Sequence, residues 1–257
     1  MYDYSFFQWL MFFYIYCFIG WCIETAFVSV KSRKFINRGF LRSPMLPIYG
    51  CGAIVILFAS LPVKEYPVLV FICGMTATSL LEFITGWLME HLLKMKYWDY
   101  SEDRFNIKGY VCLQCSLCWG ALSLFLTYFL HDYAERLVLY MSNTTVVVID
   151  CTVTAVFMTD LVYAVRTALD VNKLLAAVTD IKIEIAKAKD ELSQRIEESE
   201  RVIALNAKIE KLRADSAKLT EKISFFKKDL IRANPTARSR RFNEALEELR
   251  ERISKKL

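Results

Sequence analysis

Residues 35–52 read FINRGFLRSPMLPIYGCG and place two arginines, two prolines and three glycines in an otherwise apolar part of the chain. Gly39 permits a sharp reversal of the backbone, and Pro44 and Pro47 suit only the first turn of a helix. Gly50 lets that helix approach a neighbouring helix closely. The stretch therefore predicts a stiff junction between two packed helices.

The surrounding chain has the composition of a membrane protein. It has 257 residues, of which 55% are hydrophobic, and its mean hydropathy is positive. About 20 mostly apolar residues cross a bilayer. Five segments approach this length, the second being the shortest: 6–30, 44–61, 67–93, 109–130 and 145–169. We expect an all-α, polytopic membrane protein with about five transmembrane helices in residues 1–169 and a cytoplasmic, coiled-coil-like helical tail in residues 170–257.

Basic residues are concentrated in the loops after the first and third predicted spans. These residues are Lys31, Arg33, Lys34, Arg38 and Arg42 in one loop and Lys94, Lys96, Arg104 and Lys108 in the other. The opposite loops contribute only Lys64 and Arg136. The positive-inside rule then predicts an N-terminus outside the cell and a cytoplasmic tail. No cysteine lies in a predicted outer loop, so we expect no structural disulfide.

An offset of 70 residues places FINRGFLRSPMLPIYG over FNIKGYVCLQCSLCWG. The coinciding junction residues are Gly39 with Gly109, Tyr49 with Trp119, and Gly50 with Gly120. Because both loops are predicted on the same side, hairpins 5–61 and 67–130 are interpreted as a parallel repeat, an arrangement known from transporters. The alternative is that any helix entering the membrane at the inner face has a basic loop, a glycine and an aromatic residue.

Acidic side chains interrupt the apolar spans. Glu24, Glu82, Asp150 and Asp160 lie inside predicted spans, and Glu90 lies near the end of one. A charge at bilayer depth costs several kcal/mol, so such residues usually face a bundle interior or a wet cavity. We interpret them either as structural ion pairs or as parts of a polar pocket near the inner leaflet. The pocket candidates are Glu24, Asn37, Arg38, Arg42, Glu82, Asp99, Asn106 and Lys108.

The run Cys112, Cys115 and Cys118 has a spacing that invites a metal or cluster interpretation. On a helix the three thiols would be stacked over two turns instead of converging on one ion, so packing residues are the favoured interpretation. The sequence contains no GxxxxGK[ST], GxGxxG, HExxH or GxSxG motif. We therefore predict no metal, no cofactor and no enzymatic activity.

The tail from Val171 onward carries apolar residues at steps of three and four, as in an amphipathic helix. The register fails around residues 196–205, which predicts a stutter or a helical hairpin. Residues 171–230 are candidates for self-association or for binding partner subunits. Interspersed charges argue against nucleic acid as a partner. The basic cluster Arg232, Arg238, Arg240 and Arg241 is interpreted as a contact with anionic lipid or as a solvated turn.

Five motifs in order, GWCIET, NRGFLRSPMLPIYGCG, LEFITGW, YWDYS and GYVCLQCSLCWG, resemble the bacterial membrane family called putative ABC-transporter type IV. The resemblance covers about residues 12–120. It implies a location in the bacterial cell membrane and a permease role.

Three functions are consistent with these features. The first is a permease-like transport component in the lipid bilayer, with an inner-leaflet polar pocket and no ATPase of its own. The second is a membrane-anchored scaffold that acts through its helical tail. The third is a lipid-modifying enzyme that uses Glu24 or Asp99 beside the arginines at the inner leaflet.

Overall fold

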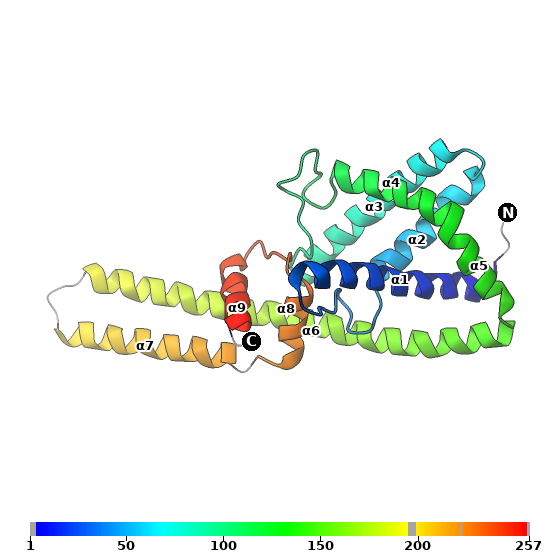
Figure 1. The fold of residues 1–257 in the computed structure, drawn as a ribbon. Coiled ribbons are helices and arrows are strands. Elements are labelled where there is room, and N and C mark those ends of the chain that lie inside the picture. Colours follow the sequence, from blue (N-terminus) through cyan, green and yellow to red (C-terminus); the bar gives the residue numbers. More distant parts are fainter. Residues whose placement is uncertain (1–3, 195–198, 222, 256–257) are drawn as a thin grey trace.

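A computed structural model describes residues 4–194, 199–221 and 223–255 (Figure 1). Its named elements are helical, which confirms the all-α class. Their bounds are α1 Phe6–Ser32, α2 Pro47–Ser60, η1 Leu61–Val63, α3 Pro67–Leu93, α4 Leu113–Phe125, the π-helical η2 Leu126–Leu130, α5 His131–Tyr140, α6 Asn143–Gln194, α7 Ser199–Glu221, α8 Phe225–Ala233 and α9 Asn243–Lys255.

Four helical segments in the described ranges are long and apolar enough to cross a membrane, one fewer than the five expected. They are Phe6–Ser32, Pro67–Leu93, Leu113–Tyr140 and Asn143–Leu192. The segment Pro47–Val63 is apolar but shorter. At about 1.5 Å per residue, α2 reaches about 21 Å, less than the roughly 30 Å of a bilayer core.

The short length of α2 follows from the chain that precedes it, residues 33–46, which we call the first junction. Leu46 is extended, as expected before Pro47, and Pro47 is the first residue of α2. Pro44 lies in the junction rather than in the first turn of the helix, contrary to expectation. Gly39 has φ +127°, a conformation that L residues rarely adopt.

The first junction folds back along α1 instead of extending away from it. The Leu46 amide donates to the Cys17 carbonyl at 3.0 Å, and Cys17 lies about four turns before the end of α1. The non-helical chain therefore runs beside the inner part of a membrane helix, where its polar backbone groups need partners within the protein.

Residues 94–112, the second junction, have the same relation to α3. The Tyr100 hydroxyl reaches Glu82 at 3.2 Å, about three turns before the end of α3. The Ser79 hydroxyl of α3 donates to the Ser116 hydroxyl of α4 at 2.8 Å. The first turn of α4 therefore lies beside the middle of α3, about four turns before α3 ends at Leu93. The predicted start of this span at residue 109 is four residues early because the junction continues to Cys112, the N-cap of α4.

The helix α6 continues from the membrane domain into the tail, so the predicted boundary at residue 169 lies inside it. In Figure 1, α7 runs back antiparallel beside the distal part of α6, which is the hairpin alternative for the tail. Ala188 of α6 and Ile209 of α7 are buried on this hairpin. Part of the apolar tail surface is thus covered within the chain.

The last two helices return to the bundle. An apolar cluster joins the end of α3 to the middle of α6 and to α9, and it includes Leu93, Val171, Leu175, Leu246, Leu249 and Ile253. Figure 1 shows α8 and α9 beside α6 where the junctions lie. We call this region the junction end of the bundle. The C-terminal part of the tail is therefore packed on the membrane domain.

Glycines allow the closest helix contacts. A Cβ atom at Gly50 of α2 would overlap the Cys17 sulfur and the Phe13 ring of α1, and one at Gly120 of α4 would overlap the Phe71 ring of α3. Gly52 differs, because a Cβ there would meet Trp119 only at ordinary contact distance, 3.8 Å.

We expect Gly50→Ala to lower the free energy of unfolding by about 1–3 kcal/mol, because the added methyl group overpacks the α1–α2 contact. The matched control Gly52→Ala should leave stability unchanged or raise it by up to about 1 kcal/mol, since alanine is the better helix former. Thermal unfolding in detergent, followed by tryptophan fluorescence, measures both. Equal behaviour of the two variants would contradict the close approach of α2 to α1 at Gly50.

Candidate functional site

Glu24 of α1 is held at the first junction by two partners. The Tyr49 hydroxyl of α2 donates to its carboxylate at 2.7 Å. The Arg38 guanidinium lies 3.8 Å from the other carboxylate oxygen. Glu24 thus forms an ion pair with Arg38 of the first junction and accepts a hydrogen bond from an aromatic hydroxyl.

Glu82 of α3 has a similar environment at the second junction. Tyr100 donates to Oε1 at 3.2 Å, and the Trp119 side chain of α4 lies beside this carboxylate. Its second oxygen, Oε2, is buried and has no hydrogen-bond partner among the described residues. Glu82 is 5% exposed, so this oxygen is a polar acceptor left open inside the bundle.

The two acidic sites meet through their aromatic donors. The rings of Tyr49 and Trp119 lie 5.7 Å apart, centroid to centroid. A continuous set of contacts therefore runs from Arg38 and Glu24 through these rings to Glu82 and Tyr100. We call it the acid–aromatic layer, and it joins the α1–α2 hairpin to the α3–α4 hairpin.

A third acid, Asp160 of α6, supports the first junction. Its Oδ2 accepts from the Arg42 amide at 3.0 Å, the Ser43 amide at 2.7 Å and the Ser43 hydroxyl at 2.6 Å. Two of these bonds give a partner to the Arg42 and Ser43 amides, which lie outside any helix and have no helical hydrogen bond. The Asp160 carboxylate thereby accepts the backbone hydrogen bonds that carbonyl groups would accept in a helix.

Asn37 and Arg42 make contacts within the first junction and with α1 and α8. Asn37 accepts from the Trp21 indole at 2.6 Å and donates to the Arg42 carbonyl at 2.8 Å. The Arg42 guanidinium lies over the ring of Phe226 of α8, 3.3 Å from its centroid. Both side chains are thus committed to internal contacts.

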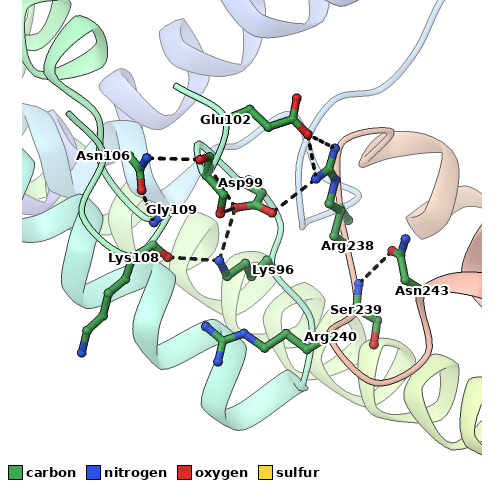
Figure 2. A network of polar contacts seen from close by, with 12 residues as sticks. Lys96, Asp99, Glu102, Asn106, Lys108, Gly109, Arg238, Ser239, Arg240 and Asn243 are labelled. Carbon is green, nitrogen blue, oxygen red and sulfur yellow. Dashed lines mark hydrogen bonds and ion pairs between the residues drawn. The ribbon is translucent and has the colours of Figure 1, made fainter. Parts of the chain in front are cut away.

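The second junction contains a cavity of about 480 Å³. Its walls come from this junction and from residues 234–242, the α8–α9 connection. The lining residues are Lys96, Asp99, Ser101, Asn106, Lys108, Arg238, Ser239, Arg240 and Asn243. Figure 2 shows that Lys96 and Arg238 both point toward Asp99. Basic residues outnumber the single carboxylate in this wall.

Asp99 organises the polar wall of this cavity. Lys96 Nζ lies 3.2 Å from Oδ1, and Arg238 Nη1 lies 3.7 Å from Oδ2. Burial raises the pKa of Asp99, but hydrogen bonds from Ser101 and Lys96 outweigh it and lower the pKa below the ordinary value. The carboxylate is therefore charged at neutral pH, and it is an ion-pair partner rather than a proton donor.

Asn106 and Lys108 shape the turn that closes the second junction. The Asn106 side chain donates to the Asp103 carbonyl at 2.8 Å and accepts from the Gly109 amide at 3.1 Å. The backbone carbonyl of Lys108 accepts a hydrogen bond from Lys96 Nζ, and the side chain of Lys108 is exposed. Gly109 has φ +73°, and a Cβ there would overlap Ser101 and Asp99.

The α8–α9 connection binds both junctions. Its Arg238 forms two antiparallel backbone hydrogen bonds with Lys96, each 2.8 Å. Asn234 donates to the Gly39 carbonyl at 3.2 Å, and Arg38 donates to the Ala233 carbonyl at 2.8 Å. A segment nearly 200 residues later in the chain thus links the two hairpins.

Two arginines of the basic cluster form ion pairs in the structure, and their side chains stay partly exposed. Arg240 Nε lies 2.5 Å from Glu90 Oε1 of α3, and Arg238 lies 3.4 Å from Glu102. These arginines are paired with carboxylates of the α3–second junction region. Arg232 is in the last turn of α8, and Arg241 is exposed.

The predicted pocket candidates are distributed over three places, because Asn37 and Arg42 make their contacts in the first junction. Glu24, Arg38 and Glu82 belong to the acid–aromatic layer, whereas the cavity of the second junction is lined by Asp99, Asn106 and Lys108. Sequence reasoning missed Lys96, Tyr100 and the α8–α9 residues as site components. The YWDYS motif carried a signal for Tyr100, but nothing local indicates that Arg238 returns to this site.

Cys112, Cys115 and Cys118 lie along the start of α4. The Cys112 sulfur accepts from the Cys115 amide at 3.4 Å as an N-cap, and Cys118 is exposed. All eight cysteines are free thiols in the described structure. The first of the three thiols thus has a capping role.

These features define a class of protein, a polytopic helical membrane protein with acidic residues held between two helix hairpins. Residues 11–165 match the family model described as "Putative ABC-transporter type IV", and the chain belongs to that family. The match extends beyond the motifs into α6. No curated protein and no solved structure matches the chain.

We expect cysteines introduced as Lys96→Cys and Arg238→Cys to form a disulfide. Directly hydrogen-bonded residues of an antiparallel pair have Cα atoms about 5.5 Å apart, within the range of disulfides. Lys96→Cys with Arg241→Cys is the matched control, because Arg241 is exposed and unpaired with Lys96 in the described contacts. Peptide mapping of the oxidised protein should show the first link in several-fold excess, and equal yields would contradict the docking of the tail.

Proposed function

We propose that this protein is a permease-like component of a membrane transport system. The supporting observation is the acid–aromatic layer, in which Glu82 retains an unpartnered oxygen where the two hairpins meet. Irregular backbone and ionisable groups at membrane depth are characteristic of transporter binding sites. The layer would contact the transported solute or ion.

The same proposal includes a topology. The junction end would face the cytoplasm, since both basic loops lie there. The first junction and α2 would together cross the bilayer, with the non-helical chain supported by Asp160 and Cys17. The N-terminus would then be outside, and α7, α8 and α9 would be cytoplasmic, with the distal part of α6.

Energy for transport would come from elsewhere. The chain has no phosphate-binding loop, so an ATP-driven mechanism would need a separate ATPase subunit. We propose that the chain itself is not an enzyme. The candidate acids of a lipid-modifying enzyme, Glu24 and Asp99, are both engaged in ion pairs, which supports this proposal.

We expect Glu82→Gln to reduce transport at least tenfold in proteoliposomes, because it removes a buried acceptor of the acid–aromatic layer. Charge movement on a solid-supported membrane is measured against a panel of amino acids, sugars and inorganic ions, and radiolabelled uptake follows any response. Glu65→Gln is the control, since Glu65 is exposed in the loop before α3. Transport by Glu82→Gln at the wild-type rate would refute a role of this layer.

A scaffold function is the second candidate, favoured by apolar residues that stay exposed on the α6–α7 hairpin. Ile183 is 48% exposed and Ile203 is 68% exposed. They would form a contact surface for a second copy or another subunit. Deleting the whole tail would not test this, because α8 and α9 pack on the bundle.

The double substitution Ile183→Ser and Ile203→Ser should abolish such an association while leaving the bundle folded, since both side chains project away from the core. Lys187→Ser with Lys211→Ser is a control on the same helices with exposed charged residues. Chemical cross-linking in native membranes, together with unfolding temperature, provides the readout. Unchanged cross-linked species would eliminate the scaffold function for this face.

A further inference from the structure

The face of α6 that packs on α1 is an apolar stripe, and Asp150 interrupts it at the level of Tyr14. Its apolar members recur at helical spacing and are Val146, Val153, Phe157, Leu161 and Ala164. Asp150 occupies the position one turn after Val146. We propose that Asp150 is a proton-binding site of the membrane bundle, held protonated between α6 and α1.

The proposal rests first on the burial of Asp150. Its side chain is 0% exposed, and neither carboxylate oxygen has a hydrogen-bond partner among the described residues. An ionised carboxylate in such surroundings costs many kcal/mol unless it is paired, so the group binds a proton instead. No ion pair of Asp150 is found in the described part of the chain.

The neighbouring groups offer no positive charge. At this level α6 packs on α1, where Tyr14 faces Asp150, and α5 packs beside Val146. The Tyr14 hydroxyl is engaged with Thr154 at 2.7 Å. The titratable residues of α5 have other partners or are exposed: His131 bonds Tyr16, Asp132 pairs with Lys64, Glu135 bonds Tyr4, and Arg136 is exposed. The contacts of α6 with α3, α8 and α9 lie farther along the helix, around Ala168 and Leu175. Nothing described at this level therefore stabilises the carboxylate form.

Asp160 provides a comparison within the same helix. It accepts three hydrogen bonds from the first junction at 2.6 to 3.0 Å, and such donors stabilise the charged form. Asp150 has none. Two aspartates on one membrane helix thus differ in their hydrogen-bond donors, three for Asp160 and none among the described residues for Asp150.

This inference does not rest on the proposed transport function. A protonated carboxyl group belongs to the folded bundle whether or not a solute is transported. The proton-binding role is assigned to Asp150 and not to the acid–aromatic layer, because Glu24 and Glu82 in that layer each accept at least one hydrogen bond. The bound ligand is a proton.

The test uses dicyclohexylcarbodiimide, a lipophilic reagent for protonated carboxyl groups. The acid adds across a C=N bond of the carbodiimide, and the resulting O-acylisourea rearranges to a stable N-acylurea without loss of any atom. The full chain is reconstituted in vesicles of phosphatidylethanolamine and phosphatidylglycerol, treated at pH 7 and at higher pH, and analysed by peptide mass spectrometry.

We expect strong labelling of Asp150 at pH 7 that declines as the pH rises, and little labelling of Asp160. An ordinary aspartate, with a pKa of about 3.9, is protonated in only about one molecule in a thousand at pH 7. The two sites should therefore differ by at least a hundredfold. Similar labelling of Asp150 and Asp160 would overturn the proposal.

An infrared measurement removes the dependence on reagent access. Asp150→Asn should eliminate a carbonyl stretching band of a protonated carboxylic acid, whereas Asp160→Asn should not. Asp150→Asn is nearly isosteric and neutral, so its unfolding temperature should equal or exceed that of the wild type. If the band persists in folded Asp150→Asn, the proposal is wrong, whatever the labelling shows.

Discussion

The hydrogen bonds that Asp160 accepts from Arg42 and Ser43 meet the main physical constraint on this fold, the need to pair every buried backbone polar group. Both junctions run back along the inner part of a long helix, where they cannot form regular helical bonds. Protein groups satisfy them instead, namely Asp160 and the Cys17 carbonyl in the first junction. Because the junctions fold inward, their side chains can reach the acids of α1 and α3.

The inward path of the junctions also explains where the polar residues meet. Tyr49 lies in the first turn of α2 and Trp119 in the second turn of α4, and each lies against an acid of the preceding long helix. Their rings then touch each other. The two hairpins therefore share one geometry. In each, a long helix is followed by a junction that runs back along it and by a shorter helix, and an aromatic residue of the shorter helix lies against an acid of the long one. This agrees with the repeat interpretation of the sequence, while duplication itself stays a prediction.

The tail adds a second level of organisation. The α8–α9 connection is bound to Gly39 in one junction and to Lys96 in the other, so the relative position of the hairpins depends on a segment that lies far away in the sequence. If one hairpin moves against the other, the α8–α9 connection must either lose its hydrogen bonds to one junction or change its own conformation. Helix α6 belongs both to the bundle and to the α6–α7 hairpin, so the hairpin is joined to the bundle by one continuous helix.

Local sequence determined the helical class, the limits of α1 and α3 to within two residues, and the start of α2 at Pro47, since hydropathy and proline act within a few residues. It also indicated Glu24 and Glu82, because charge in an apolar run is visible locally. Tertiary structure decided that Arg42 stacks on Phe226 and that Arg238 and Arg240 pair with the second junction and α3. These outcomes depend on contacts between distant segments, and only the packed chain determines which carboxylate receives a donor and which, like Asp150, receives none.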